Sequence, residues 1–110
     1  MANEAPDNGN RELSETAQRY DTLRKSIPFV QPPDTLVVTG SLAAAFPDDL
    51  PSILTKVKEF STFTEDNDPW REHDFGAFEH KGEKIFWKID DYNGNEGYDL
   101  VVTVMLASDY

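Results

Sequence analysis

The chain has 110 residues, enough for one domain, and its apolar fraction of 38% and aromatic fraction of 12% indicate a folded protein rather than a disordered one. It has no cysteine and no apolar run of 18 residues, which excludes disulfides, thiolate zinc sites and a membrane-spanning helix. The formal net charge of −11 argues against direct binding to nucleic acid, because a phosphate backbone attracts clustered Lys and Arg. The lack of cysteine suits a reducing cytoplasm, where we expect the protein to act.

The N-terminal part predicts a tail and then a helix. Residues 1–11 are polar and lack the basic and apolar regions of a secretory signal, so we expect a disordered tail before a single α+β domain over residues 12–110. Over residues 12–27 apolar side chains recur every three or four positions, which predicts a helix with one apolar face. Prolines in residues 28–34 end that helix and form a stiff connector.

The middle of the chain predicts a strand and two helical pieces. The sequence "TLVVTG", residues 35–40, is typical of a short strand that ends at glycine. A short helical turn over residues 41–46 precedes a main helix over residues 48–60, and Pro51 falls in the first turn of that helix, where proline is tolerated.

The C-terminal part predicts three strands. The sequences "DFGAFEH" and "EKIFWKID" flank "KG" and predict a β-hairpin, in which Ile85, Trp87 and Ile89 point to one face. The segment "LVVTVMLAS" is apolar on both faces, which predicts a central strand. The whole order predicts an α+β fold, with a small antiparallel sheet of about four strands and two helices packed on one face.

One segment raises a question of function: "FTEDNDPWREHDFG", residues 63–76. It holds five carboxylates between Glu65 and Asp74, and Asn67, Asp68 and Pro69 place it in a loop because these residues favour turns. It could be a metal site, a catalytic loop or a negatively charged binding surface.

The metal and catalytic readings lack a complete template. The candidate ligands are Asp66, Glu72, His73 and Asp74, but Trp70 and Arg71 stand where a calcium loop needs its turn, and no H-E-x-x-H motif is present. The chain also lacks a nucleophile elbow and a phosphate-binding glycine loop, so we assign no catalytic residue, metal or cofactor. Whether the protein is an enzyme stays open, with Glu72, His73 and Asp74 as the cluster such an activity would use.

The binding reading accounts for the density of charge. Turn formation needs one or two acids, whereas this loop has five, and an aromatic side chain among charges can anchor a protein interface. Carboxylates fit a basic protein surface, because they speed the encounter and pair with Arg and Lys. The predicted partner-binding residues are Glu65, Asp66, Trp70, Glu72, Asp90, Asp91 and Tyr92.

Three stretches carry a resemblance: "FTEDNDPWREHDFGAFE", "IFWKIDDY" and the terminal "VMLASDY". They are similar to the pattern of the domain of unknown function 3768 family, over residues 60–110. Asp91 departs from that pattern, which has an aromatic residue there, and the loop "NGNEGYD" is shorter than the family's Ser/Asp/Pro-rich loop.

The resemblance implies a setting rather than an activity, since family members are small bacterial proteins found on mobile elements beside anti-defence genes. Together with the acidic charge, that setting favours an inhibitor of a host defence complex, of the anti-CRISPR or anti-restriction type. Such an inhibitor would bind a basic, nucleic-acid-handling protein, as a nucleic-acid mimic, and would be a monomer or a small homo-oligomer. The alternatives are a metal-dependent hydrolase and a small regulatory partner such as an antitoxin.

Overall fold

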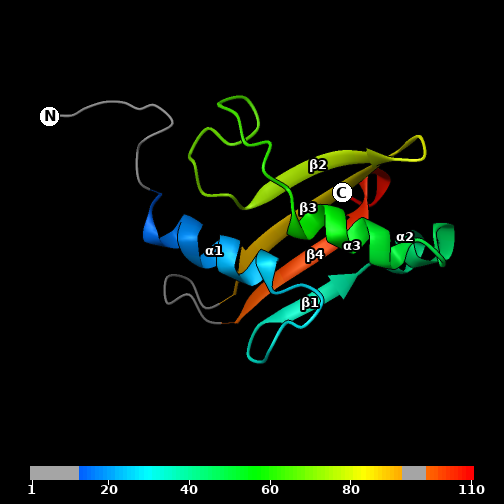
Figure 1. Cartoon of the computed structure of the whole chain (residues 1–110), viewed down its shortest axis with the longest axis horizontal. Helices are drawn as coiled ribbons and strands as arrows, with labels where there is room; N and C mark the ends of the chain where they lie inside the picture. The colour runs from blue at the N-terminus through cyan, green and yellow to red at the C-terminus, as the bar shows by residue number, and fades with distance from the viewer. Residues whose placement is uncertain (1–12, 93–98) are drawn as a thin grey trace, which may run out of the picture.

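A computed structural model of the chain describes residues 13–92 and 99–110 (Figure 1). It confirms the predicted α+β class, because the helices cover one face of a four-stranded sheet. The predicted tail over residues 1–11 and most of the turn-rich loop before the last strand lie outside the described residues. Within the described part of the chain, no helix has the length and apolar character needed to cross a bilayer.

Helix α1 spans Glu15–Lys25 and begins later than the apolar pattern predicts. The reason is Ser14, whose side-chain oxygen accepts a hydrogen bond of 3.1 Å from the Ala17 backbone N–H and so caps the helix. Glu15 lies in the first turn, and Arg24 and Lys25 lie in the last, which complements the helix dipole.

Strand β1, Thr35–Val38, leads directly into two helices, α2 (Gly40–Ala45) and α3 (Leu50–Lys58). The predicted split into two helical pieces is confirmed. Gly40 begins α2 rather than ending the strand, because the Thr39 hydroxyl caps the helix by accepting from the Leu42 N–H.

The predicted hairpin consists of β2 (Phe75–His80) and β3 (Glu83–Asp91). Its two turn residues, Lys81 and Gly82, have φ angles of 51° and 86°. Positive φ at both positions is the geometry of a type I′ turn, whose twist matches that of the strands it joins. Strand β4, Leu100–Leu106, follows and ends in a short 3₁₀ helix, η1 (Ala107–Asp109).

The strand order is β1-β4-β3-β2, so β4 is central as predicted. Strand β3 pairs antiparallel with both β2 and β4, but β1 pairs parallel with β4. The expectation of a wholly antiparallel sheet is therefore wrong at this edge. The two helices and the hairpin that separate β1 from β4 can return the chain in either direction, and no local pattern decides which.

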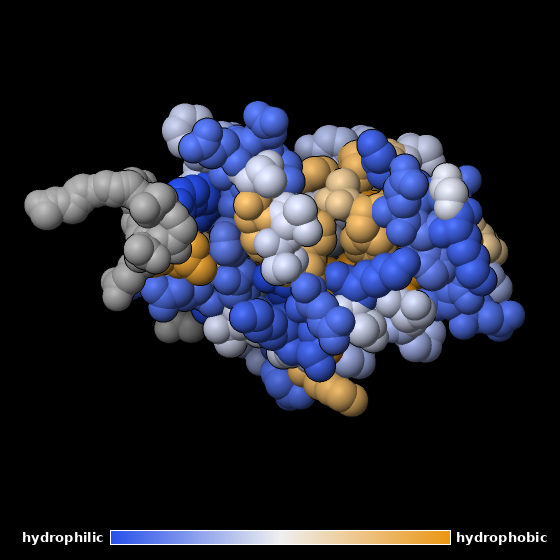
Figure 2. Space-filling model, turned by 45° about the horizontal axis from the view of Figure 1, so that its top comes forward, coloured by the Kyte–Doolittle hydropathy of each residue, from blue (hydrophilic) through white to orange (hydrophobic). Residues whose placement is uncertain are grey.

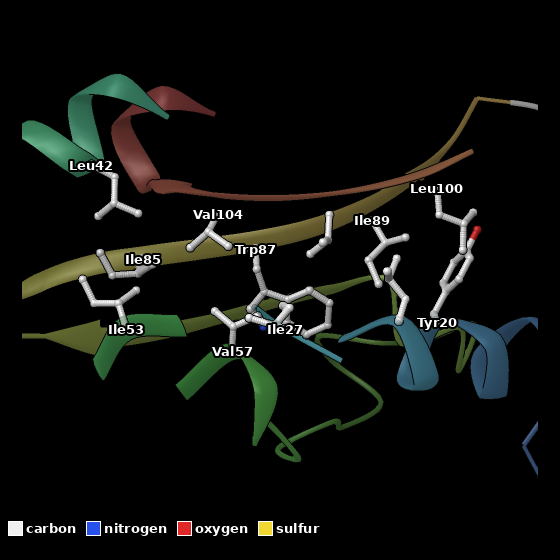
Figure 3. Packing of buried hydrophobic residues seen from close by; sticks show 12 residues of the cluster. Tyr20, Ile27, Leu42, Ile53, Val57, Ile85, Trp87, Ile89, Leu100 and Val104 are labelled. Atoms are coloured by element: carbon white, nitrogen blue, oxygen red, sulfur yellow. The ribbon is translucent and has the colours of Figure 1, made fainter. Parts of the chain in front are cut away.

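The core lies between the sheet and the helices (Figure 3). Trp87 is 0% exposed, and Ile85 and Ile89 are buried beside it, which confirms the predicted inner face of β3. Gly76 is needed where the indole of Trp87 crosses β2, since a Cβ atom there would lie 2.3 Å from Trp87 Nε1. The ladder between β2 and β3 is unbroken at this point.

Candidate functional site

The acidic loop, residues 61–74, joins α3 to β2 and is shaped by its own polar side chains. The Asn67 side-chain oxygen accepts from the Thr64 N–H (2.9 Å), and the Thr64 hydroxyl accepts from the Asn67 N–H (3.2 Å). The Asn67 amide also donates to the Thr62 carbonyl oxygen at 3.0 Å. These bonds close the first turn of the loop, which is the role predicted for Asn67.

Asp68 closes the second turn and is only 6% exposed. Its carboxylate accepts from the backbone N–H groups of Glu72 (3.1 Å) and His73 (3.3 Å). Arg71 and His73 have positive φ angles of 57° and 58°, which residues other than glycine rarely adopt. The carboxylate of Asp68 therefore stabilises a backbone shape that the residues themselves disfavour.

His73 turns inward and is held by contacts on each side. Its Nδ1 lies 2.9 Å from the Asp21 carboxylate of α1, and its Nε2 lies 3.6 Å from Asp68. Its ring stacks on Phe63, with centroids 3.8 Å apart and planes 2° from parallel. His73 thus attaches the loop to α1.

Arg24 supports the attachment of the loop to α1 through Asp21, and it is 1% exposed. Its guanidinium pairs with Asp21 at 2.9 Å and lies over the Trp87 ring at 5.1 Å. It also donates to three carbonyl oxygens at the end of α3, at 2.9–3.0 Å. A positive charge at the C-terminal end of a helix interacts favourably with the helix dipole. The three acceptors are the carbonyls of Val57, Lys58 and Phe60.

Four other side chains of the loop point to solvent. Glu65, Asp66 and Glu72 are exposed, and Trp70 is 82% exposed. The predicted contact residues of the loop are therefore accessible, whereas Asp68 and His73 are used to build it.

The second predicted group lies at the end of β3. Tyr92 is 72% exposed, Asp91 is half-buried, and the half-buried Asp90 pairs with Lys88 at 2.9 Å.

Burial raises the pKa of the Tyr20 phenol of α1, and neighbouring carboxylates raise it further. Those carboxylates are Asp91, Asp74, Glu72 and Asp90.

Both predicted segments therefore lie near the Tyr20 phenol, whose pKa is raised by Glu72 from the loop and by Asp91 from β3. Burial and neighbouring carboxylates also shift the pKa of Asp74. Burial raises the pKa of its carboxyl, a hydrogen bond from its own backbone N–H lowers it, and the carboxylates of Asp68 and Asp90 raise it.

The geometry does not assemble the ligand set considered for a metal. Asp66 and Glu72 point to solvent, whereas His73 is occupied by Asp21 and Phe63. Across residues 13–92 and 99–110, no group of three or more His, Asp or Glu side chains is arranged to hold a metal ion.

Sequence reasoning missed Asp21 and Arg24, which support the loop from α1, and the carboxylates gathered around Tyr20. Asp21 lies 52 positions from His73 in the chain, and nothing in the local pattern links the two. The face of the molecule drawn in Figure 2 is mostly hydrophilic, with apolar side chains gathered near its centre.

The fold and the site define a class: a small acidic α+β protein that presents a braced, carboxylate-rich loop at one end of its sheet. The family model described as "Protein of unknown function (DUF3768)" matches residues 38–109, and the chain belongs to this family. The match begins earlier than the resemblance over residues 60–110 and takes in α2 and α3. No curated protein and no solved structure matched the chain.

Proposed function

We propose that this chain is an acidic interaction protein that binds a basic surface of a nucleic-acid-handling protein in the cytoplasm. In that role it inhibits a host defence complex, of the anti-CRISPR or anti-restriction type. The observation that carries the proposal is Trp70, 82% exposed among the exposed side chains of Glu65, Asp66 and Glu72. An aromatic anchor surrounded by charges is a common arrangement in protein interfaces.

The supporting structure of the loop favours binding without rearrangement. The turns are closed by Asn67 and Asp68, and His73 ties the loop to α1. A loop that is already ordered loses less conformational entropy when it binds, so more of the contact energy appears as affinity. Because Asp68 is buried and His73 is half-buried, we expect changes at the exposed contact residues to leave the fold intact.

The charge indicates the kind of partner. Carboxylates form charge-assisted hydrogen bonds with Arg and Lys, and those with Arg are often bidentate. Glu72 lies close enough to the group around Asp90, Asp91 and Tyr92 for both to act on the same tyrosine. Carboxylates of both segments therefore lie around one tyrosine, and together they would suit a groove that normally holds a nucleic-acid backbone.

The test compares two triple variants with the same change of charge. Glu65→Lys, Asp66→Lys and Glu72→Lys together reverse the loop, whereas Glu59→Lys, Glu79→Lys and Glu83→Lys reverse exposed acids elsewhere. Each set adds six charges and takes the formal net charge from −11 to −5. The wild-type chain captures the partner from the native host, and the purified partner is then titrated with all three proteins by calorimetry.

We expect the loop variant to lose binding and the control variant to retain it, with unchanged thermal melts for both. Wild-type binding should weaken as salt rises, since exposed charges are screened beyond about 8–10 Å at physiological ionic strength. Double-stranded DNA should compete with the chain for the partner. Equal affinity of the loop variant and the wild type would remove this loop from the interface.

A further inference from the structure

A second cluster of titratable side chains lies apart from the acidic loop, where α3 runs beside the hairpin (Figure 1). Lys56 Nζ on α3 lies 3.1 Å from His80 Nδ1 at the end of β2. His80 Nε2 in turn lies 2.9 Å from the carboxylate of Asp49, which precedes α3. The three groups form a chain of hydrogen bonds from amine to imidazole to carboxylate.

The hydrogen bonds determine which ring nitrogen carries the proton. A lysine ammonium group only donates, so His80 Nδ1 has to be the acceptor of the bond from Lys56. The proton of the neutral imidazole then lies on Nε2, where the Asp49 carboxylate accepts it. Asp49 thereby orients His80 with a free base directed at Lys56.

The surroundings leave the amine accessible and shield the base. Lys56 is exposed, whereas His80 is 5% exposed and packs edge-on against the Phe46 ring at 5.2 Å. Lys56 Nζ also lies 5.8 Å from the centre of the Phe78 ring and 3.5 Å from the Glu79 carbonyl oxygen. The other cation at the cluster is Lys81, whose Nζ pairs with Asp49 at 2.9 Å.

We propose that Lys56 is a modification site, at which activated acyl donors such as acyl phosphates or thioesters acylate the amine. A nucleophile within hydrogen-bond reach of a base that a third group orients is the arrangement that activates side chains for acyl transfer. The inference is independent of the acidic loop, because none of the three residues belongs to it.

The reaction balances without a further reactant. After solvent has taken one proton from the ammonium group, the Lys56 amine attacks the carbonyl carbon of an acyl phosphate and a C–N bond forms. His80 Nδ1 takes the proton from the resulting tetrahedral intermediate. The bond from carbon to the phosphate oxygen breaks, phosphate leaves with the electron pair, and the imidazolium returns its proton to solvent. The product is an amide at Lys56, with one positive charge lost.

The chain supplies a matched comparison in Lys58, which is exposed on the same helix and has no side-chain hydrogen bond or ion pair within the described residues. The full chain is treated with acetyl phosphate, and the acetylation rates at both lysines are followed by peptide mass spectrometry. We expect Lys56 to react about tenfold faster than Lys58, less than the roughly 10²–10⁴-fold that a base contributes when an enzyme also binds its substrate. The same chain in urea should show equal rates.

Two variants decide the origin of the difference. His80→Gln and Asp49→Asn should each bring Lys56 close to the rate of Lys58 and leave Lys58 unchanged. If His80→Gln unfolds the chain, as circular dichroism would reveal, Asp49→Asn gives the answer because Asp49 is more exposed. Equal rates for the two lysines in the folded wild type would overturn the proposal. A fast Lys56 that persists in the folded variants would overturn it as well.

Discussion

Arg24 has a role that its place in the sequence does not suggest. It stands in the last turn of α1, where a base complements the dipole of its own helix. In the structure its guanidinium instead satisfies the carbonyl oxygens at the end of α3 and pairs with Asp21, which holds His73. One buried charge therefore joins α1, α3 and the acidic loop.

Replacement of Arg24 by methionine tests this role. The change removes the guanidinium from three carbonyl oxygens and from Asp21, which keeps only its contact with His73. Loss of one member of a buried ion pair costs about 3–5 kcal/mol in the free energy of unfolding. The neighbouring Lys25→Met is the control, because Lys25 is exposed and surface changes stay within roughly 0.5 kcal/mol. Urea unfolding of both variants provides the measurement, and equal losses would contradict the role of Arg24.

We expect Asp74 to make the stability of the fold depend on pH in the direction opposite to that of most carboxylates. Burial raises the pKa of its carboxyl, so the folded state binds this proton more tightly than the unfolded state does. The ionised form is therefore unfavourable to folding, and the loss appears as pH rises through the raised pKa. Asp74→Asn should raise the melting temperature at pH 7, with a gain that shrinks as pH falls through the raised pKa and is gone below the unfolded value of about 3.9. A variant that melts lower at pH 7 would show that the negative charge is needed.

At the scale of elements, helix ends are secured by residues that are distant in sequence. The end of α3 depends on Arg24 of α1, and the start of α2 depends on the C-terminus. The Asp109 carboxylate accepts hydrogen bonds from the hydroxyls of Thr39 (2.8 Å) and Ser41 (2.6 Å) and from the Leu106 N–H (3.1 Å). Helix η1 is thereby fastened to the beginning of α2.

This fastening should depend on pH. Hydrogen bonds from Ser41 and Thr39 lower the pKa of the Asp109 carboxyl, so its contribution to stability is complete above the unfolded pKa of about 3.9. It is lost as pH falls through the lower, folded value. Asp109→Asn should therefore lower the melting temperature at pH 7 and have little effect near pH 2. Thermal melts across this range test the point, and a deficit that stays constant with pH would contradict it.

At the scale of the whole molecule, the excess of acids is a cost to folding as well as a means of binding. A formal net charge of −11 on a chain of 110 residues produces self-repulsion in the compact state. The carboxylates around Tyr20 concentrate part of that repulsion at one end of the sheet. The buried supports of the loop hold together a surface that its own charge would push apart.

Salt should therefore stabilise the folded protein. Between about 10 mM and 1 M ionic strength the screening length falls from about 30 Å to 3 Å, which weakens repulsion among exposed carboxylates more than the buried Arg24–Asp21 pair. The melting temperature should rise with sodium chloride. The rise should be smaller for the variant with Glu59, Glu79 and Glu83 changed to lysine, whose net charge is −5. A melting temperature that falls with salt would show that attractive surface pairs dominate instead.

The sequence by itself determined the elements and the inner face of the hairpin. Period-3.6 and period-2 patterns report which side of a helix or strand avoids water, so they identified α1, α3, β3 and β4 and the burial of Trp87. Turn chemistry placed "KG" between β2 and β3, because positive φ at both residues is a local property.

The tertiary structure alone decided how the elements face one another. The parallel pairing of β1 with β4 joins residues 66 positions apart, such as Val38 and Val104, and no local pattern specifies its direction. The same holds for His73. From the sequence it could be a metal ligand or a structural residue of the loop, and only the fold places Asp21, far away in the chain, beside it. Solvent avoidance and turn formation act over a few residues and can be read from the chain, whereas the partner of a buried charge depends on the packing of the whole fold.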